Sequence, residues 1–237
     1  MGIISSVKRQ LHRDIVADPI LHARVLNLYL SGEAYPHTVD DYFPVQHVEP
    51  ELAGLMRAHM RDEDKHIALY AHAIAALGAE VIDLPPACIF NHVIRSHTAD
   101  PWRVEAGCGD DLRRDRVANF FAHAHWLEKR IARSLEIHLD ACAHAASPIP
   151  GKAVGIVLAD ETRHVTYTRE AIFELVPRQR ALAILASHRV SEQRANYDFS
   201  ASQLRRLIVE EQPRWPASRR LFYGACSFVM RGMFACA

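Results

Sequence analysis

The sequence predicts an all-α protein: a four-helix bundle with one long crossover and additional N- and C-terminal helices. Residues that favour helices, chiefly Ala, Leu, Arg and Glu, dominate the chain, and the polar–apolar alternation of half-buried strands is scarce. The long helical stretches also come in two pairs separated by a long connection. That order is typical of a bundle in which one connection crosses from end to end.

The expected elements follow from apolar periodicity and from the residues that start or stop helices. Pro50 suits a first helical turn, Gly78 suits a helix stop, and Pro177 ends a further helix. After a short amphipathic N-terminal helix, we expect helices at 19–34, 50–77, 113–146, 152–176, 178–197 and 200–211. A turn-rich linker is expected at 35–44, and a crossover with a short helix near 89–96 is expected at 83–112. The chain then ends in an apolar tail at 221–237. We therefore assign residues 1–177 to the bundle and 178–237 to a helical extension packed on it.

Composition narrows the classes of function. The formal net charge of the 237 residues is zero, which gives no bulk attraction to nucleic acid. Five cysteines without a C-x-x-C pair suit a reducing, cytoplasmic location better than a disulfide framework. No run of eighteen uncharged apolar residues occurs, so membrane contact is not expected. The fifteen histidines raise the expectation of metal binding.

A repeated five-residue pattern is the most informative feature of the chain. Residues 62–66 and 160–164 both read Asp-Glu-x-basic-His. On a helix, a glutamate and a histidine three positions apart lie on the same face and can reach one metal ion. Both faces are otherwise apolar, where a carboxylate is costly unless it is paired or bound to metal. The pattern therefore predicts metal ligands at Glu63, His66, Glu161 and His164.

Each of the other two bundle helices offers one acid on its apolar face. Glu33 lies on the stripe that carries Leu26 and Leu30. Glu128 shares its face with apolar residues, whereas Glu136 shares its face with charged ones and is expected to be solvated. Four carboxylates would balance two divalent cations, and a set of imidazole and carboxylate ligands without thiolate suits iron or manganese.

Glu33, Glu63-x-x-His66, Glu128 and Glu161-x-x-His164 resemble the ligand set of the ferritin-like di-iron carboxylate superfamily. The added aspartate and basic residue of each motif resemble its oxygen-activating branch, which includes bacterial multicomponent monooxygenases and ribonucleotide reductase small subunits. The resemblance covers about residues 19–177. It implies that Asp62 and Asp160 hydrogen-bond the ligand histidines. The chain departs from many monooxygenases of this branch at Ala132, where they carry a threonine.

The resemblance implies a di-iron oxidase or oxygenase that uses O2 to oxidise a small organic substrate. A mixed manganese–iron pair is the alternative cofactor. Electrons would come from a separate donor protein or from the substrate, and we expect a homodimer. The alternative function is iron handling, meaning ferroxidase activity, storage or peroxide scavenging, without an organic substrate.

Several other residues near the expected centre have two interpretations. His59 and His125 lie one turn from Glu63 and Glu128 and are candidate extra ligands, although core histidines in such positions are usually satisfied by a neighbour. Tyr70 and Tyr167 are candidate redox-active residues, with core packing as the alternative. His72, His97 and His123 are expected on the surface. The tail is expected to be a docked helix or a dimer surface.

Overall fold

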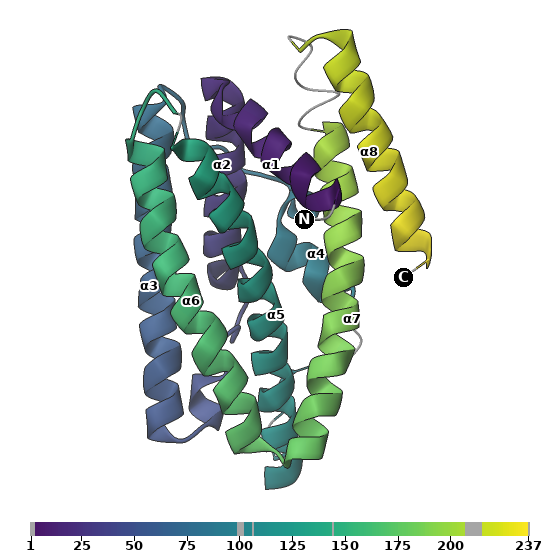
Figure 1. The fold of residues 1–237 in the computed structure, drawn as a ribbon. Helices are drawn as coiled ribbons and strands as arrows, with labels where there is room; N and C mark the ends of the chain where they lie inside the picture. Colours follow the sequence, from purple (N-terminus) through teal and green to yellow (C-terminus); the bar gives the residue numbers. More distant parts are fainter. Residues whose placement is uncertain (1–2, 99–101, 106, 144, 207–214, 237) are drawn as a thin grey trace.

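The computed structural model describes residues 3–98, 102–105, 107–143, 145–206 and 215–236, and within these ranges the protein is all-helical. These ranges contain eight α-helices, which are labelled in Figure 1 and joined in places by short 3-10 turns. The α-helices are α1 (Ile3–Val16), α2 (Pro19–Ala34), α3 (Pro50–Ala76), α4 (Phe90–Ser96), α5 (Asp110–Cys142), α6 (Ile149–Leu175), α7 (Arg178–Gln203) and α8 (Ala217–Cys236).

Local sequence signals fix several helix ends. The Asp18 side chain accepts hydrogen bonds from the backbone N–H groups of Ile20 and Leu21, which caps α2 just before its first-turn Pro19. Gly78 follows α3 with φ of 74°, a left-handed conformation that favours glycine. The expected bounds of α2 are confirmed, and α3 ends one residue earlier than expected.

Helices α2, α3, α5 and α6 form a bundle around a shared core. Helix α3 packs against α2 and α6, and α6 packs along α5 (Figure 1). One apolar cluster includes Met56, Phe121 and Ile172, and another includes Tyr70, Leu135 and Val157. On α3, α5 and α6 the predicted ligands fall between these two clusters in sequence. The polar residues therefore lie midway along the bundle, enclosed by apolar layers.

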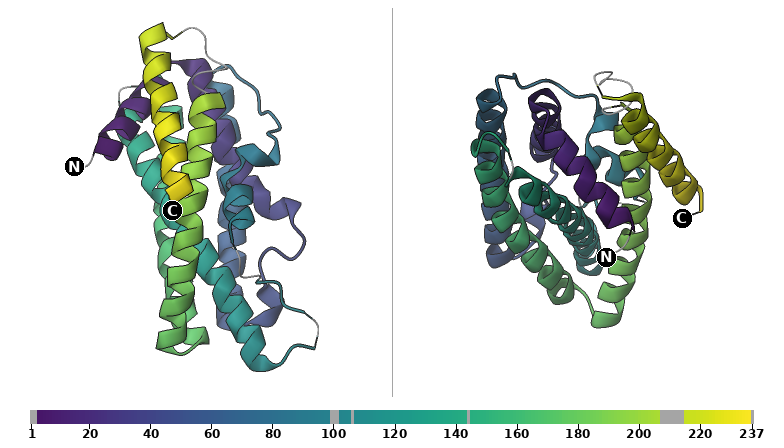
Figure 2. Two further views of the ribbon diagram at one scale, coloured as in Figure 1. Left: turned by 90° about the vertical axis from the view of Figure 1, so that its right-hand side faces the viewer. Right: turned by 45° about the horizontal axis from the view of Figure 1, so that its top comes forward.

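The remaining helices cover the outside of this bundle. Helix α7 lies against α5 and α4, and α8 lies against α7 on the side away from α3 and α6 (Figure 2). The side chain of Tyr223 on α8 is buried, and its hydroxyl donates a hydrogen bond to Asp14 of α1. Leu221 and Phe228 of α8 remain 74% and 78% exposed. The tail is thus a docked helix with an exposed apolar face, and the expected homodimer stays a prediction.

The helix expected at 113–146 instead spans Asp110–Cys142, and two further expectations were wrong. Helices were expected to break between 197 and 200, but α7 runs without interruption to Gln203. The intervening residues include neither proline nor glycine, so nothing stops the helix there. The expected stretch 207–211 lies outside the described residues. His123 was expected at the surface, but it is 1% exposed and its ring stacks on Trp102 at 4.3 Å between centroids.

None of the helices in the described ranges combines the length and apolar content that a membrane span requires.

Candidate metal centre

The six predicted ligands converge from four helices. Glu33 comes from α2, Glu63 and His66 from α3, Glu128 from α5, and Glu161 and His164 from α6, and each of these side chains belongs to a residue no more than 5% exposed. Carboxylate and imidazole donors of Glu33, Glu63, His66 and Glu161 lie within 4.8 Å of one another. A second group with the same spacing contains His59, Glu63 and His164. Glu63 therefore belongs to two adjoining groups of candidate ligands.

Both motif histidines turn the same ring nitrogen toward the carboxylates. His66 Nδ1 lies 3.3 Å from Glu33 Oε2 and 3.5 Å from Glu161 Oε1. His164 Nδ1 lies 3.1 Å from Glu161 Oε2. A metal-binding histidine uses one ring nitrogen for the ion and donates the other N–H to a fixed acceptor. The two Nδ1 atoms are thus placed to bind ions within the carboxylate cluster.

The outer nitrogens contact the aspartates of the opposite motif. His66 Nε2 lies 3.0 Å from Asp160 Oδ2, and His164 Nε2 lies 3.3 Å from Asp62 Oδ2. The resemblance implied that these aspartates hydrogen-bond the ligand histidines, and the distances agree. The exchange across helices has a simple cause: an aspartate directly before its glutamate points about 100° away from it around the helix axis. It therefore reaches across to the neighbouring helix.

The basic residue of each motif completes this pairing. Lys65 Nζ lies 2.8 Å from Asp62 Oδ1 and 2.5 Å from Asp160 Oδ2. Arg163 contacts both aspartates as well, at 3.2 Å and 2.5 Å. Burial raises the pKa of Asp160, but hydrogen bonds from Lys65, His66 and Arg163 outweigh burial and lower its pKa overall. Two cations and two carboxylates therefore form a fixed network that links α3 to α6.

The glutamates have the opposite electrostatic situation. Burial raises the pKa of Glu63, Glu128 and Glu161, and neighbouring carboxylates raise it further. Burial lowers the pKa of His66, but Glu33 and Asp160 more than offset this and raise it overall. Glu161 Oε1 is buried without a hydrogen-bond partner. Such a cluster needs either protons or bound cations to be stable, and its orphaned oxygen fits a metal ligand.

His59, expected only as a possible extra ligand, is in direct contact with two of the predicted ligands. Its ring stacks on His164 at 3.6 Å between centroids, and its Nδ1 lies 2.6 Å from the Tyr167 hydroxyl. Its Nε2 lies 2.8 Å from Glu63 Oε1, but outside hydrogen-bonding geometry, since this buried atom has no hydrogen-bond partner. Glu128 lies farther out, with Oε1 at 3.6 Å from the same nitrogen. His59 is therefore a seventh candidate ligand.

Of the other candidate residues, some lie beside the candidate centre and others pack in the apolar core. His125 lies with its Nδ1 at 3.0 Å from the Val165 carbonyl oxygen, so its ring N–H is satisfied by backbone, as expected of a core histidine. Tyr70 is fully buried and its hydroxyl has no hydrogen-bond partner; burial and the nearby Glu33 raise its pKa. Tyr42 was missed because it lies in the linker before α3. Its ring lies 5.2 Å from that of Phe43, which in turn lies 5.1 Å from the His59 ring, so Tyr42 lies close to the centre. Burial raises the pKa of Tyr42, and Glu128 and Glu63 raise it further.

Comparisons of this chain with protein-family models, curated proteins and solved structures found no match.

Proposed function

We propose that this protein is a ferritin-like di-iron oxidase or oxygenase. The observation that carries the proposal is the convergence of the two Asp-Glu-x-basic-His motifs, with the Nδ1 of each histidine toward buried glutamates and Nε2 on the aspartate of the other motif. Glu33, Glu63, His66, Glu128, Glu161 and His164 would hold two iron ions, with a manganese–iron pair as the alternative. Bound ferrous ions would supply the electrons and the open positions that O2 reduction requires.

The protein's own residues have separate tasks in this proposal. The four glutamates balance the charge of two divalent ions and can bind through one or both oxygens. Asp62 and Asp160 hold the histidine rings in one orientation and fix which nitrogen carries the proton. Lys65 and Arg163 keep these aspartates ionised. The apolar layers above and below the cluster exclude water from it.

Aromatic side chains form one wall of the centre. The Phe43 ring lies 5.1 Å from that of His59, and Tyr167 lies 6.0 Å from Phe121 and is hydrogen-bonded to His59. An aromatic wall of this kind suits a small organic substrate. The Tyr167 hydroxyl is also placed to exchange a proton with His59. Electrons for turnover would come from a separate donor protein or from the substrate itself.

Metal analysis tests the proposal directly. Protein purified from iron-replete cells should hold close to two transition-metal ions per chain. Anaerobic Fe(II) loading followed by O2 should then produce an optical change that saturates at two Fe(II) per chain. A stoichiometry at or below one with both motifs intact would contradict a di-metal centre.

The second candidate function is iron handling without an organic substrate. The observation that favours it concerns the cavities: those of about 810 Å³ and 220 Å³ are lined by none of the predicted ligands. An organic substrate would need an opening that the described structure does not provide at those cavities. Accumulation of many more than two iron atoms per chain in a large assembly would favour storage. Saturation at two in a small oligomer would favour the oxidase.

A further inference from the structure

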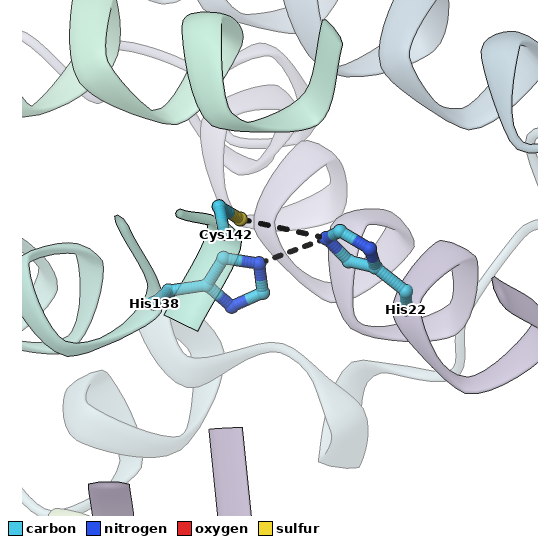
Figure 3. A group of neighbouring side chains, drawn as sticks. All are labelled: His22, His138 and Cys142. Atoms are coloured by element: carbon cyan, nitrogen blue, oxygen red, sulfur yellow. Dashed lines mark hydrogen bonds between the residues drawn. The ribbon is translucent and has the colours of Figure 1, made fainter. Parts of the chain in front are cut away.

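A second group of metal-binding side chains lies apart from the four-glutamate centre. His22 of α2 and His138 and Cys142 of α5 come together, with their donor atoms within 4.8 Å of one another (Figure 3). His22 Nε2 lies 3.0 Å from His138 Nε2 and 4.0 Å from Cys142 Sγ. These residues are 1%, 0% and 7% exposed. His22 is separated from His138 by 116 residues and from Cys142 by 120, so the three form no local sequence motif.

The distances suit a single bound ion. Bonds of about 2.0 Å to nitrogen and about 2.3 Å to sulfur in a trigonal arrangement put the donors roughly 3.5 to 3.7 Å apart. The observed separations of 3.0 Å and 4.0 Å differ from this by only a few tenths of an ångström. Both imidazoles are buried, which favours the neutral form that binds metals.

The opposite nitrogen of His138 is already held. His138 Nδ1 lies 3.1 Å from His12 Nδ1 and 3.3 Å from the Tyr29 hydroxyl. These two residues can accept the Nδ1–H and leave Nε2 as the ligand atom, which is the usual arrangement behind a metal-binding histidine. They contact the wrong nitrogen to serve as ligands themselves. Among the described residues, the group therefore offers three donors rather than four.

Ligand type, number and charge together select the ion. A thiolate with two imidazoles prefers softer ions, unlike the carboxylate centre. Structural zinc sites almost always use four ligands, whereas this group has three. A dication with one thiolate would leave a net positive charge in a buried place, and Cu(I) with one thiolate leaves none. We propose that His22, His138 and Cys142 form a three-coordinate Cu(I) site.

The surroundings give the thiol a route to solvent. Cys142 also lines the cavity of about 810 Å³, whose wall includes Arg9, Asp140 and Gly151. Gly151 lets α6 approach closely, because a Cβ atom there would lie 3.1 Å from Cys142 Cβ. The ion could thus reach the sulfur from the cavity while the imidazoles close the site from the interior.

A Cu(I) competition titration tests this site. Reduced, metal-free protein would be titrated anaerobically against a chromophoric Cu(I) chelator. Wild-type protein should withdraw one Cu(I) per chain. Cys142→Ser and His22→Gln should weaken this binding by more than about 100-fold, beyond the loss typical of an outer hydrogen-bond partner. Cys88→Ser, which alters another buried cysteine, should retain it.

X-ray absorption of the Cu(I)-loaded wild-type protein keeps the test valid if a variant fails to fold. One sulfur and two nitrogen neighbours at copper would support the proposal. Three outcomes would overturn it: unchanged Cu(I) affinity in folded Cys142→Ser and His22→Gln, a copper environment without sulfur, or one Zn²⁺ per chain that Cu(I) cannot displace.

Discussion

At the level of single residues, the exchange of aspartates between the motifs is the most specific feature of the centre. Asp160 is 5% exposed and serves His66, whereas Asp64, one position after Glu63, is exposed and pairs with the exposed His37. Both aspartates lie next to a predicted ligand in sequence, but only Asp160 contacts a predicted ligand histidine. This difference separates an aspartate at the candidate centre from one at the surface.

We therefore expect Asp160→Asn to slow Fe(II) oxidation or weaken iron binding by roughly 10- to 100-fold, because the asparagine cannot accept the histidine N–H as strongly. Asp62→Ala should act in the same direction. Asp64→Asn is the matched control and should change neither quantity. Equal rates in all three variants and the parent would remove the reason for preferring oxygen activation over iron storage.

The two glutamates of α5, Glu128 and Glu136, give a second matched pair of single-residue tests. Glu128 is buried at the centre, and Glu136 is exposed, as the helix face predicted. Glu128→Ala should lose one or both metal ions, because it removes a carboxylate from the centre. Glu136→Ala should be nearly silent, as substitutions at solvated positions usually are. Metal analysis that found the reverse would show that the ligand is assigned to the wrong acid.

At the level of helices, a bidentate salt bridge connects the outer helix α7 to α5 of the bundle. Arg180 donates from Nε and Nη2 to the two oxygens of Asp115 on α5, at 2.6 Å and 2.8 Å. These hydrogen bonds lower the pKa of Asp115. The pair fixes the start of α7 beside α5, which carries Glu128 and His138.

A lowered carboxyl pKa stabilises the folded protein above the unfolded-state pKa of about 3.9, and this stabilisation is lost as the pH falls through the folded-state pKa. Asp115→Asn should therefore reduce the free energy of unfolding at pH 7, by no more than about 1 kcal/mol because the pair is partly exposed. The difference from wild type should shrink near pH 3. Denaturant unfolding at both pH values, with Glu136→Gln as control, measures this. A difference that grew at low pH would contradict it.

At the level of the whole molecule, the centre joins α2, α3, α5 and α6 through one set of side chains. Buried carboxylates in contact raise one another's pKa, so the metal-free centre is under electrostatic strain. Metal ions bound only by the folded state would relieve this strain and favour the fold by mass action.

Loading with Fe(II) or Mn(II) at about 100 times Kd should thus stabilise the protein by roughly 2.7 kcal/mol for each ion bound. For a chain of this size, each bound ion corresponds to a rise of about 5–10 °C in the unfolding temperature. Calorimetry under anaerobic conditions measures the shift, and Glu63→Ala should abolish it because Glu63 belongs to both ligand groups. The same unfolding temperature with and without metal would argue for a bundle without a metal centre.

The sequence by itself determined the helical class, the bounds of α2, and which faces of α3, α5 and α6 are buried. These are consequences of local propensity and of apolar spacing along one helix. It could not reveal that Asp160 serves His66, that His59 stacks on His164, or that His22 meets Cys142. Those contacts join residues on different helices, so only the packing of the helices in three dimensions decides them. The buried His123 was missed for the same reason, since burial by a neighbouring element leaves no local pattern. The unbroken α7 instead follows from a local feature, because no proline or glycine lies between residues 197 and 200.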